Sequence, residues 1–183
     1  SDRNELTARA KLRWQPTADL RLQLTAFHVD LDNGYDDFNL DNSDTTYSDK
    51  PGEDSQQTDA AALRGSLALG EVADLVSITS VASSDIAYGF DADWGNDDFW
   101  QPFVYDYTQR IDRQRDTLNQ ELRLVSRPEH RVLGADWLVG AYVLRLDEDI
   151  RQRDTGRDDG GSFEGDKASK YTATNLAAYV ALA

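Results

Sequence analysis

The sequence predicts an all-β protein, an antiparallel up-and-down meander of about seven strands that is part of a larger β-barrel. Three observations support this prediction. Seven runs alternate apolar and polar side chains with the period of two that is typical of strands. Short and long connections follow one another along the chain. No stretch approaches the roughly 18 apolar residues that a membrane-spanning helix needs.

The first two predicted strands form a hairpin around a tight break at residues 15–19. The first covers residues 7–14 and the second begins at Leu20. In both, small or apolar side chains alternate with polar ones, which gives each strand two unlike faces. The apolar members are Ala8, Ala10, Leu12 and Trp14, followed by Leu20, Leu22, Leu24 and Ala26.

The remaining runs continue the meander. The predicted strands are residues 60–69, 73–90, 118–126, 136 to about 151, and 171–182. Their connections are short at residues 70–71 and 128–134, and long and polar at residues 39–57, 91 to about 114, and 154–167. Turns that are short at one end and long at the other are the layout of a transmembrane β-barrel. Several runs also exceed the roughly 9–11 residues that cross a bilayer.

A soluble, acidic β-sandwich that binds carbohydrate is the alternative interpretation. A sandwich requires the apolar faces of all seven runs to meet in one core. A barrel requires those faces to form a continuous outer band, with polar residues such as Arg21, Gln23, Arg64 and Arg123 pointing inward. The two interpretations therefore differ in where the apolar faces lie.

Composition excludes several functions. The 34 acidic and 19 basic side chains give a formal charge of −15, which repels nucleic-acid phosphates. Without cysteine, the chain has no disulfide and no thiolate chemistry. The two histidines, His28 and His130, are too few for a histidine-rich metal site. We therefore expect no nucleic-acid partner, no metal and no cofactor.

Short motifs give little support to catalysis or to calcium binding. Asp154, Thr155 and Gly156 match the aspartic-protease triplet, but that mechanism needs two such carboxylates and the chain has one triplet. Residues 30–37 resemble a calcium loop in composition, yet Gly34 stands fifth and not sixth from Asp30. We expect a turn there, and we expect the protein not to be an enzyme.

The most unusual local composition lies in residues 90–100, where aromatic and acidic side chains alternate. Exposed rings near carboxylates stack on sugars or flat ligands. The alternative is a loop that packs its own aromatic rings against neighbouring loops. The candidate ligand-binding residues are Trp94, Phe99, Trp100 and Tyr105, with Arg110 as a partner for an anionic ligand.

Aromatic residues also suggest two belts at the water interfaces of a membrane. Trp14 and Trp137 lie beside short connections. A second set lies nearer the long connections: Tyr35, Phe38, Tyr88, Phe90, Trp94 and Tyr171. Ordinary strand aromatics in a soluble core are the alternative explanation.

Several segments, taken in order, resemble TonB-dependent outer-membrane receptors, and within them a poorly characterised proteobacterial branch. The longest is residues 34–54, GYDDFNLDNSDTTYSDKPGED. The others are KLRWQP at 11–16 with LRL at 20–22, ELRLVS at 121–126, DWLVGAY at 136–142, and NLAAY at 175–179. The resemblance covers nearly the whole chain and implies a plugged barrel of about 22 strands in the outer membrane of a Gram-negative cell.

The resemblance also implies the function and the partners. Such a receptor imports a nutrient such as a siderophore, cobalamin or an oligosaccharide, and TonB energises uptake through the plug. Residues 1–183 are expected to be a partial barrel domain without the plug and the C-terminal strands, so no TonB-contact residue can be assigned. The remaining expected partner is outer-membrane lipid, including lipopolysaccharide, which divalent ions would bridge to the acidic loops.

Overall fold

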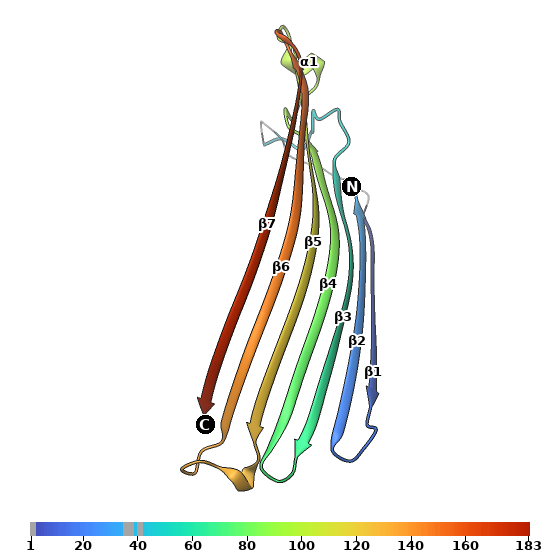
Figure 1. The fold of residues 1–183 in the computed structure, drawn as a ribbon. Helices are drawn as coiled ribbons and strands as arrows, with labels where there is room; N and C mark the ends of the chain where they lie inside the picture. The colour runs from blue at the N-terminus through green and yellow to red at the C-terminus, as the bar shows by residue number, and fades with distance from the viewer. Residues whose placement is uncertain (1–2, 35–38, 40–41) are drawn as a thin grey trace.

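The computed structural model describes residues 3–34, 39 and 42–183, which form one seven-stranded antiparallel sheet (Figure 1). The strands are β1 (Arg3–Trp14), β2 (Leu20–Asn33), β3 (Glu53–Leu69), β4 (Ala73–Asp91), β5 (Tyr105–Ser126), β6 (Trp137–Asp158) and β7 (Gly161–Leu182). Tyr35, Phe38 and parts of the 30–37 and 34–54 segments lie outside the described residues. Two short helices, α1 (Asp97–Trp100) and η1 (Pro128–His130), interrupt the connections. No described helix is long and apolar enough to span a membrane.

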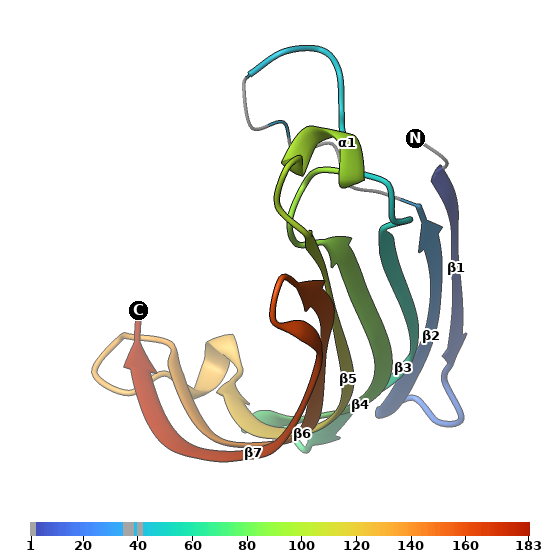
Figure 2. The same ribbon diagram turned by 90° about the horizontal axis from the view of Figure 1, so that it is seen from above.

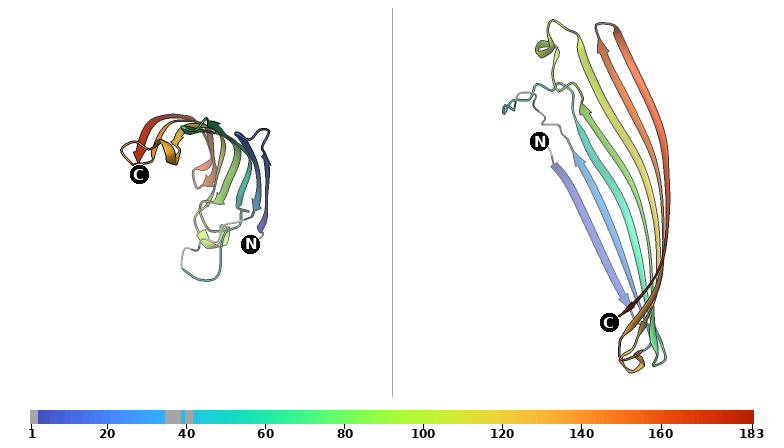
Figure 3. Two further views of the ribbon diagram at one scale, coloured as in Figure 1. Left: turned by 90° about the horizontal axis from the view of Figure 1, so that it is seen from below. Right: turned by 90° about the vertical axis from the view of Figure 1, so that its left-hand side faces the viewer.

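Each strand pairs with the next one along the chain, so the predicted all-β antiparallel meander of seven strands is confirmed. The sheet is open, because β1 and β7 pair with a described strand on one side only. Seen from above and below, the strands follow an arc (Figures 2 and 3). The connections β1–β2, β3–β4 and β5–β6 all lie at the same end of the sheet, the lower end in Figure 1.

The strands are longer than the sequence predicted, and the prediction of a third long connection is wrong. Residues 154–167 form the ends of β6 and β7, which meet at a tight turn at Asp159 and Gly160. The Asp158 carboxylate accepts a hydrogen bond from the Gly160 amide at 2.8 Å. Gly161 then adopts a φ of 126°, which glycine tolerates without strain. These residues were taken for a loop because both faces of the strands are polar there, so the alternating pattern is lost.

The two faces of the sheet differ in exposure. On β6, Gly140, Glu148 and Asp154 point to one face and are buried, whereas Asp149 and Arg153 point to the other and are exposed. Side chains crowd on the concave side of a curved sheet and spread apart on the convex side. We therefore call the face of Glu148 and Asp154 the inner face, and the opposite one the outer face.

An apolar band covers the outer face near the short turns. The pairing brings the apolar members of all seven strands onto this face. On β3 the band runs from Ala61 to Leu69, about 27 Å along the strand. Its exposed members include Leu12, Trp14, Leu24, Leu63, Leu67, Leu69, Val81, Leu118, Leu122, Val139, Leu176, Val180 and Leu182.

The band ends at one lateral row of paired residues. This row is His28, Asp59, Ser83, Asp116, Asp147 and Thr172 on β2 to β7. Beyond it, toward the long loops, the outer face becomes charged. On β6 and β7 the change begins one row nearer the short turns, because Arg145 and Thr174 lie in the row of Leu118 on the outer face, so the boundary is level on β2 to β5 only.

The residues of the two predicted aromatic belts lie on different faces of the sheet. Trp14 and Trp137 lie on the outer face beside the short turns. Tyr88, Phe90 and Tyr171 lie on the inner face, so they form no outer belt at the other boundary.

The described residues contain no core between two sheets. Among them only Ala73 and Val76 are buried hydrophobic side chains. A sandwich needs a second sheet to cover its apolar face, whereas here one sheet leaves its apolar band exposed. The arrangement therefore lacks the core that the sandwich interpretation requires.

Candidate ligand-binding site

The connection between β4 and β5 is built around the carboxylate of Asp93, which is only 3% exposed. Its Oδ1 accepts hydrogen bonds from the Gly95 amide at 2.8 Å and from the Trp100 indole Nε1 at 3.1 Å. Its Oδ2 accepts one from the Tyr107 amide at 2.6 Å. One buried carboxylate therefore ties together the turn, α1 and the start of β5.

Four aromatic rings pack on one another above this carboxylate. The stacked rings of Tyr47 and Phe99 lie 4.9 Å apart, and the Phe99–Trp100 and Trp100–Tyr105 pairs meet edge-to-face at 5.1 Å. We call these four residues the aromatic cap; α1, which carries two of them, lies on the concave side of the arc (Figure 2). Gly95 lies directly beneath the Trp100 ring, where a Cβ atom would overlap it.

The cap brings together three of the five predicted ligand-binding residues: Phe99, Trp100 and Tyr105. Their mutual contacts are those of a loop that packs its own aromatics, which was the alternative interpretation of this segment. Trp94 occupies the adjoining turn with a φ of 55°. Arg110 is not in this group.

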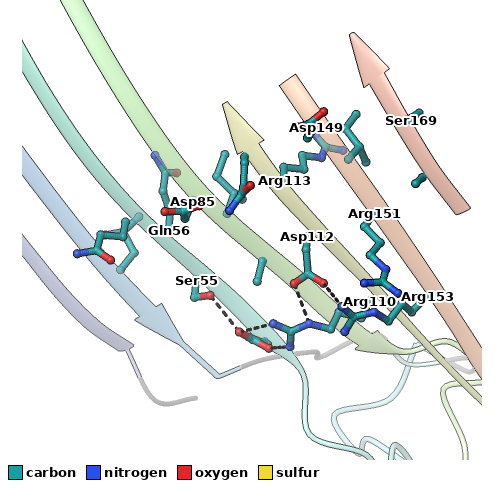
Figure 4. Close-up of a pocket in the computed structure, with 18 of the residues that line it drawn as sticks. Ser55, Gln56, Asp85, Arg110, Asp112, Arg113, Asp149, Arg151, Arg153 and Ser169 are labelled. Carbon is teal, nitrogen blue, oxygen red and sulfur yellow. Dashed lines mark hydrogen bonds and ion pairs between the residues drawn. The ribbon is translucent and has the colours of Figure 1, made fainter. Parts of the chain in front are cut away.

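Arg110 points to the outer face, into a hollow of about 1120 Å³ above the apolar band (Figure 4). Its guanidinium group pairs with Glu53 and, at 2.9 Å, with Asp112. The neighbouring cations Arg151 and Arg153 contact carboxylates as well. This hollow is therefore lined by paired charges, and Arg110 points to the opposite face of β5 from Tyr105.

Asp91, the last residue of β4, anchors the 42–52 segment, which carries Tyr47 of the cap. Its side chain is fully buried (0% exposed), and its Oδ2 accepts hydrogen bonds from the Ser48 hydroxyl at 2.7 Å and the Asp49 amide at 3.1 Å. Oδ1 has no partner among the described residues. Burial raises the pKa of this carboxyl, and the nearby charge of Asp93 adds to the effect.

A second group of polar side chains lies on the inner face next to the cap. Asp154, 9% exposed, accepts hydrogen bonds from the Tyr107 hydroxyl at 3.0 Å, from Gln109 Nε2 at 2.9 Å and from Gln152 Nε2 at 3.0 Å. The hydrogen bonds from Gln152 and Gln109 hold the pKa of Asp154 below its usual value. Burial raises the pKa of the Tyr107 hydroxyl. Together with Phe163, these four residues form what we call the inner cluster.

Phe163 reaches the inner cluster across a glycine. It pairs with Gly156 on β6, which in turn pairs with Tyr107 on β5. A Cβ atom on Gly156 would overlap the Phe163 ring, so only glycine lets the ring lie flat toward Tyr107. The two ring centroids are 5.8 Å apart.

The inner cluster was not predicted from the sequence. Asp154 was taken for part of a protease-like triplet in a loop. Tyr107 with Gln109 and Gln152 with Asp154 each follow the period of two that places them on one face, but they stand in segments taken for loops. Only the extended strands reveal that pattern.

Nothing in the described residues groups three or more histidine, aspartate or glutamate side chains as a metal site would. No protein-family model, no curated protein and no solved structure matches the chain. The geometry of the two faces is therefore the basis for a functional proposal.

Proposed function

We propose that the chain is a wall segment of an outer-membrane β-barrel receptor that imports a nutrient, with uptake energised through TonB. The main observation in support of this proposal is the apolar band on the convex face of a single curved sheet. A band about 25 Å tall on the outer face is what lipid requires of a barrel. In water, the same exposed surface would be a strong liability for aggregation.

The inner face supports the same proposal. Arg21, Gln23, Arg64 and Arg123 all point to it, behind the apolar band. Charged side chains at this level belong in a polar barrel interior and are costly against lipid. The open edges of β1 and β7 would pair with further strands of a closed barrel, which leaves no unpaired edge.

Polar side chains within the band satisfy one another. Gln120 accepts a hydrogen bond from the Thr79 hydroxyl at 2.5 Å and donates one to the Ser77 hydroxyl at 3.1 Å. Polar groups that face hydrocarbon need such internal partners. These three residues are thus compatible with a membrane-facing position.

The ligand site of the proposed receptor is the concave surface at the long-loop end. There the inner cluster adjoins the aromatic cap, since Asp93 binds both Trp100 and the Tyr107 amide. Both groups lie above the level of the band, where an extracellular ligand enters. Binding there is non-covalent, and the receptor carries out no bond chemistry.

Adjacent residues on β3 provide the test. Leu63 lies in the middle of the apolar band, and Ala62 points to the inner face between Thr25 and Ser80. In the full-length protein, Leu63→Arg places a charge against lipid at a cost of about 2–4 kcal/mol. Ala62→Arg places the same charge in the polar interior, at little cost.

The measurements are membrane fractionation and the shift of the folded band on a gel without boiling. We expect the unaltered protein and Ala62→Arg in the outer membrane with a heat-modifiable band, and Leu63→Arg with a reduced folded fraction. Recovery of the unaltered protein as a soluble monomer would contradict the proposal. Equal tolerance of the two arginines would contradict the assignment of the faces.

A further inference from the structure

The inner cluster presents hydrogen-bond acceptors in a fixed orientation. Asp154 holds the Nε2 groups of Gln109 and Gln152. Since the carboxamide oxygen and nitrogen are bonded to one planar carbon and point in different directions, anchoring each nitrogen directs each Oε1 away from Asp154. Neither Oε1 has a hydrogen-bond partner in the part of the chain that the structure describes. Two preoriented acceptors therefore remain for hydroxyl donors.

An aromatic surface lies beside these acceptors. Phe163 remains 39% exposed although its ring covers Gly156, and Tyr107 adjoins it. An aromatic face beside planar acceptors suits a ligand that has both C–H faces and hydroxyl groups.

The charges of the inner cluster also favour a neutral ligand. Its carboxylate is saturated by donors, and the neighbouring cation, Lys167, contacts that carboxylate at 3.6 Å. The cluster therefore offers no unpaired cation to an anionic chelate. Arg110, the residue expected to bind an anion, lies on the other face.

We infer that the inner cluster binds a neutral, polyhydroxylated ligand of the oligosaccharide class, with Phe163 as the stacking platform and Gln109 and Gln152 as acceptors. This inference rests on the proposed function and narrows its ligand. Asp154 acts as a positioning residue, because it holds the two carboxamides.

Calorimetry on the full-length receptor in detergent tests the inference. The probes are neutral hexasaccharides of glucose, xylose and mannose, with ferric citrate and cobalamin as alternatives. We expect one hexasaccharide class to bind. Phe163→Leu removes the ring, Gln152→Met removes the acceptor at similar volume, and each should weaken binding about tenfold. Tyr171→Ala removes an exposed ring lower on the same strand and face and serves as the matched control, with unchanged affinity.

Binding of ferric citrate or cobalamin, with no hexasaccharide bound, would overturn the inference. So would hexasaccharide binding that is unaffected by both Phe163→Leu and Gln152→Met. Heat modifiability shows separately that each variant folds. A receptor that fractionates to the outer membrane yet binds only ferric citrate would refute the ligand class and leave the proposed function intact.

Discussion

Glu53 on β3 and Arg110 on β5 form an ion pair across the intervening strand, over Gly89 on β4. The three residues occupy one lateral row, and the Arg110 Nη2 atom lies 3.4 Å from Glu53 Oε1. A side chain at position 89 would stand between them. The guanidinium and the carboxylate are 42% and 35% exposed, so solvent screens their attraction.

The first prediction concerns this pair. Gly89→Leu should separate Glu53 from Arg110, and because the pair is half exposed the loss should stay below about 1 kcal/mol. Gly89→Ala is the control, since its Cβ would lie 3.6 Å from Gln109 O and 3.8 Å from Glu53 Cβ, at ordinary contact distance. Urea unfolding in lipid vesicles measures the difference. A loss of several kcal/mol for Gly89→Leu would mean that the pair is not screened.

The second prediction concerns a glycine that cannot be replaced. Tyr179 on β7 lies across Gly140 on β6, and its hydroxyl donates a hydrogen bond to Glu121 on β5. A Cβ atom at position 140 would overlap the Tyr179 ring. Gly140→Ala should therefore displace the ring and cost about 1–3 kcal/mol.

Gly65→Ala is the matched control, because its Cβ would meet only Leu22 Cδ2 at 3.5 Å. Tyr179→Phe separates the ring from the hydroxyl, since it keeps the packing and loses the hydrogen bond. Unfolding midpoints of the three variants should rank Gly140→Ala as the least stable. If Gly65→Ala is equally destabilised, the crossing of the ring is not the cause.

The sequence predicted the sheet where one face is apolar and the other polar. That contrast defined the seven strands, their order and the faces of Leu24, Leu63 and Leu122. It disappears where both faces meet water, and there the strand ends at 53–59, 105–117 and 152–170 were left out of the predicted strands, most of them as parts of the long connections. The inner cluster stands on those ends, so it was missed with them.

The sequence predicted which residues belong to the candidate site, but it did not predict how they are arranged. The aromatic residues of the cap were singled out, but their packing depends on Asp93 and on a stacking partner, Tyr47, from another loop. Arg110 was grouped with Tyr105 because they are close in sequence. An odd and an even position on one strand point to opposite faces, and the start of that strand was not recognised.

The third prediction tests the hydrogen bond that holds the cap. Trp100→Phe keeps an aromatic ring and removes the indole N–H that Asp93 accepts at 3.1 Å. Because the acceptor is a buried carboxylate, the loss should be about 1.5–3 kcal/mol. Limited proteolysis of the 92–104 connection should become faster. Trp14→Phe, on the exposed outer face, controls for the loss of a tryptophan and should leave this cleavage unchanged.

The last prediction concerns pH and the buried carboxyl of Asp91. Its pKa in the folded protein is raised above the ordinary value of 3.8, so the folded protein holds this proton more tightly than the unfolded chain. The extra stability that this tighter proton binding provides is fully present at pH values below 3.8 and is lost as pH rises through the raised pKa of Asp91. Burial is the main cause of the raised pKa, and the charges of Asp93 and Asp49 add to it, whereas the hydrogen bonds from the Ser48 hydroxyl and the Asp49 amide oppose it.

The 42–52 segment should therefore be held most firmly below the ordinary pKa of 3.8 and should loosen as pH rises through the raised pKa of Asp91. Hydrogen exchange of its amides measures this directly, with rates corrected for the intrinsic effect of pH. Asp91→Asn keeps an acceptor for Ser48 and Asp49 without a charge, so protection should become independent of pH. Asp91→Ala should release the segment at every pH, whereas Asp85→Asn on the outer face should change nothing. Protection that increases toward neutral pH in the unaltered protein would show that Asp91 is held as the charged form, because its hydrogen bonds outweigh its burial.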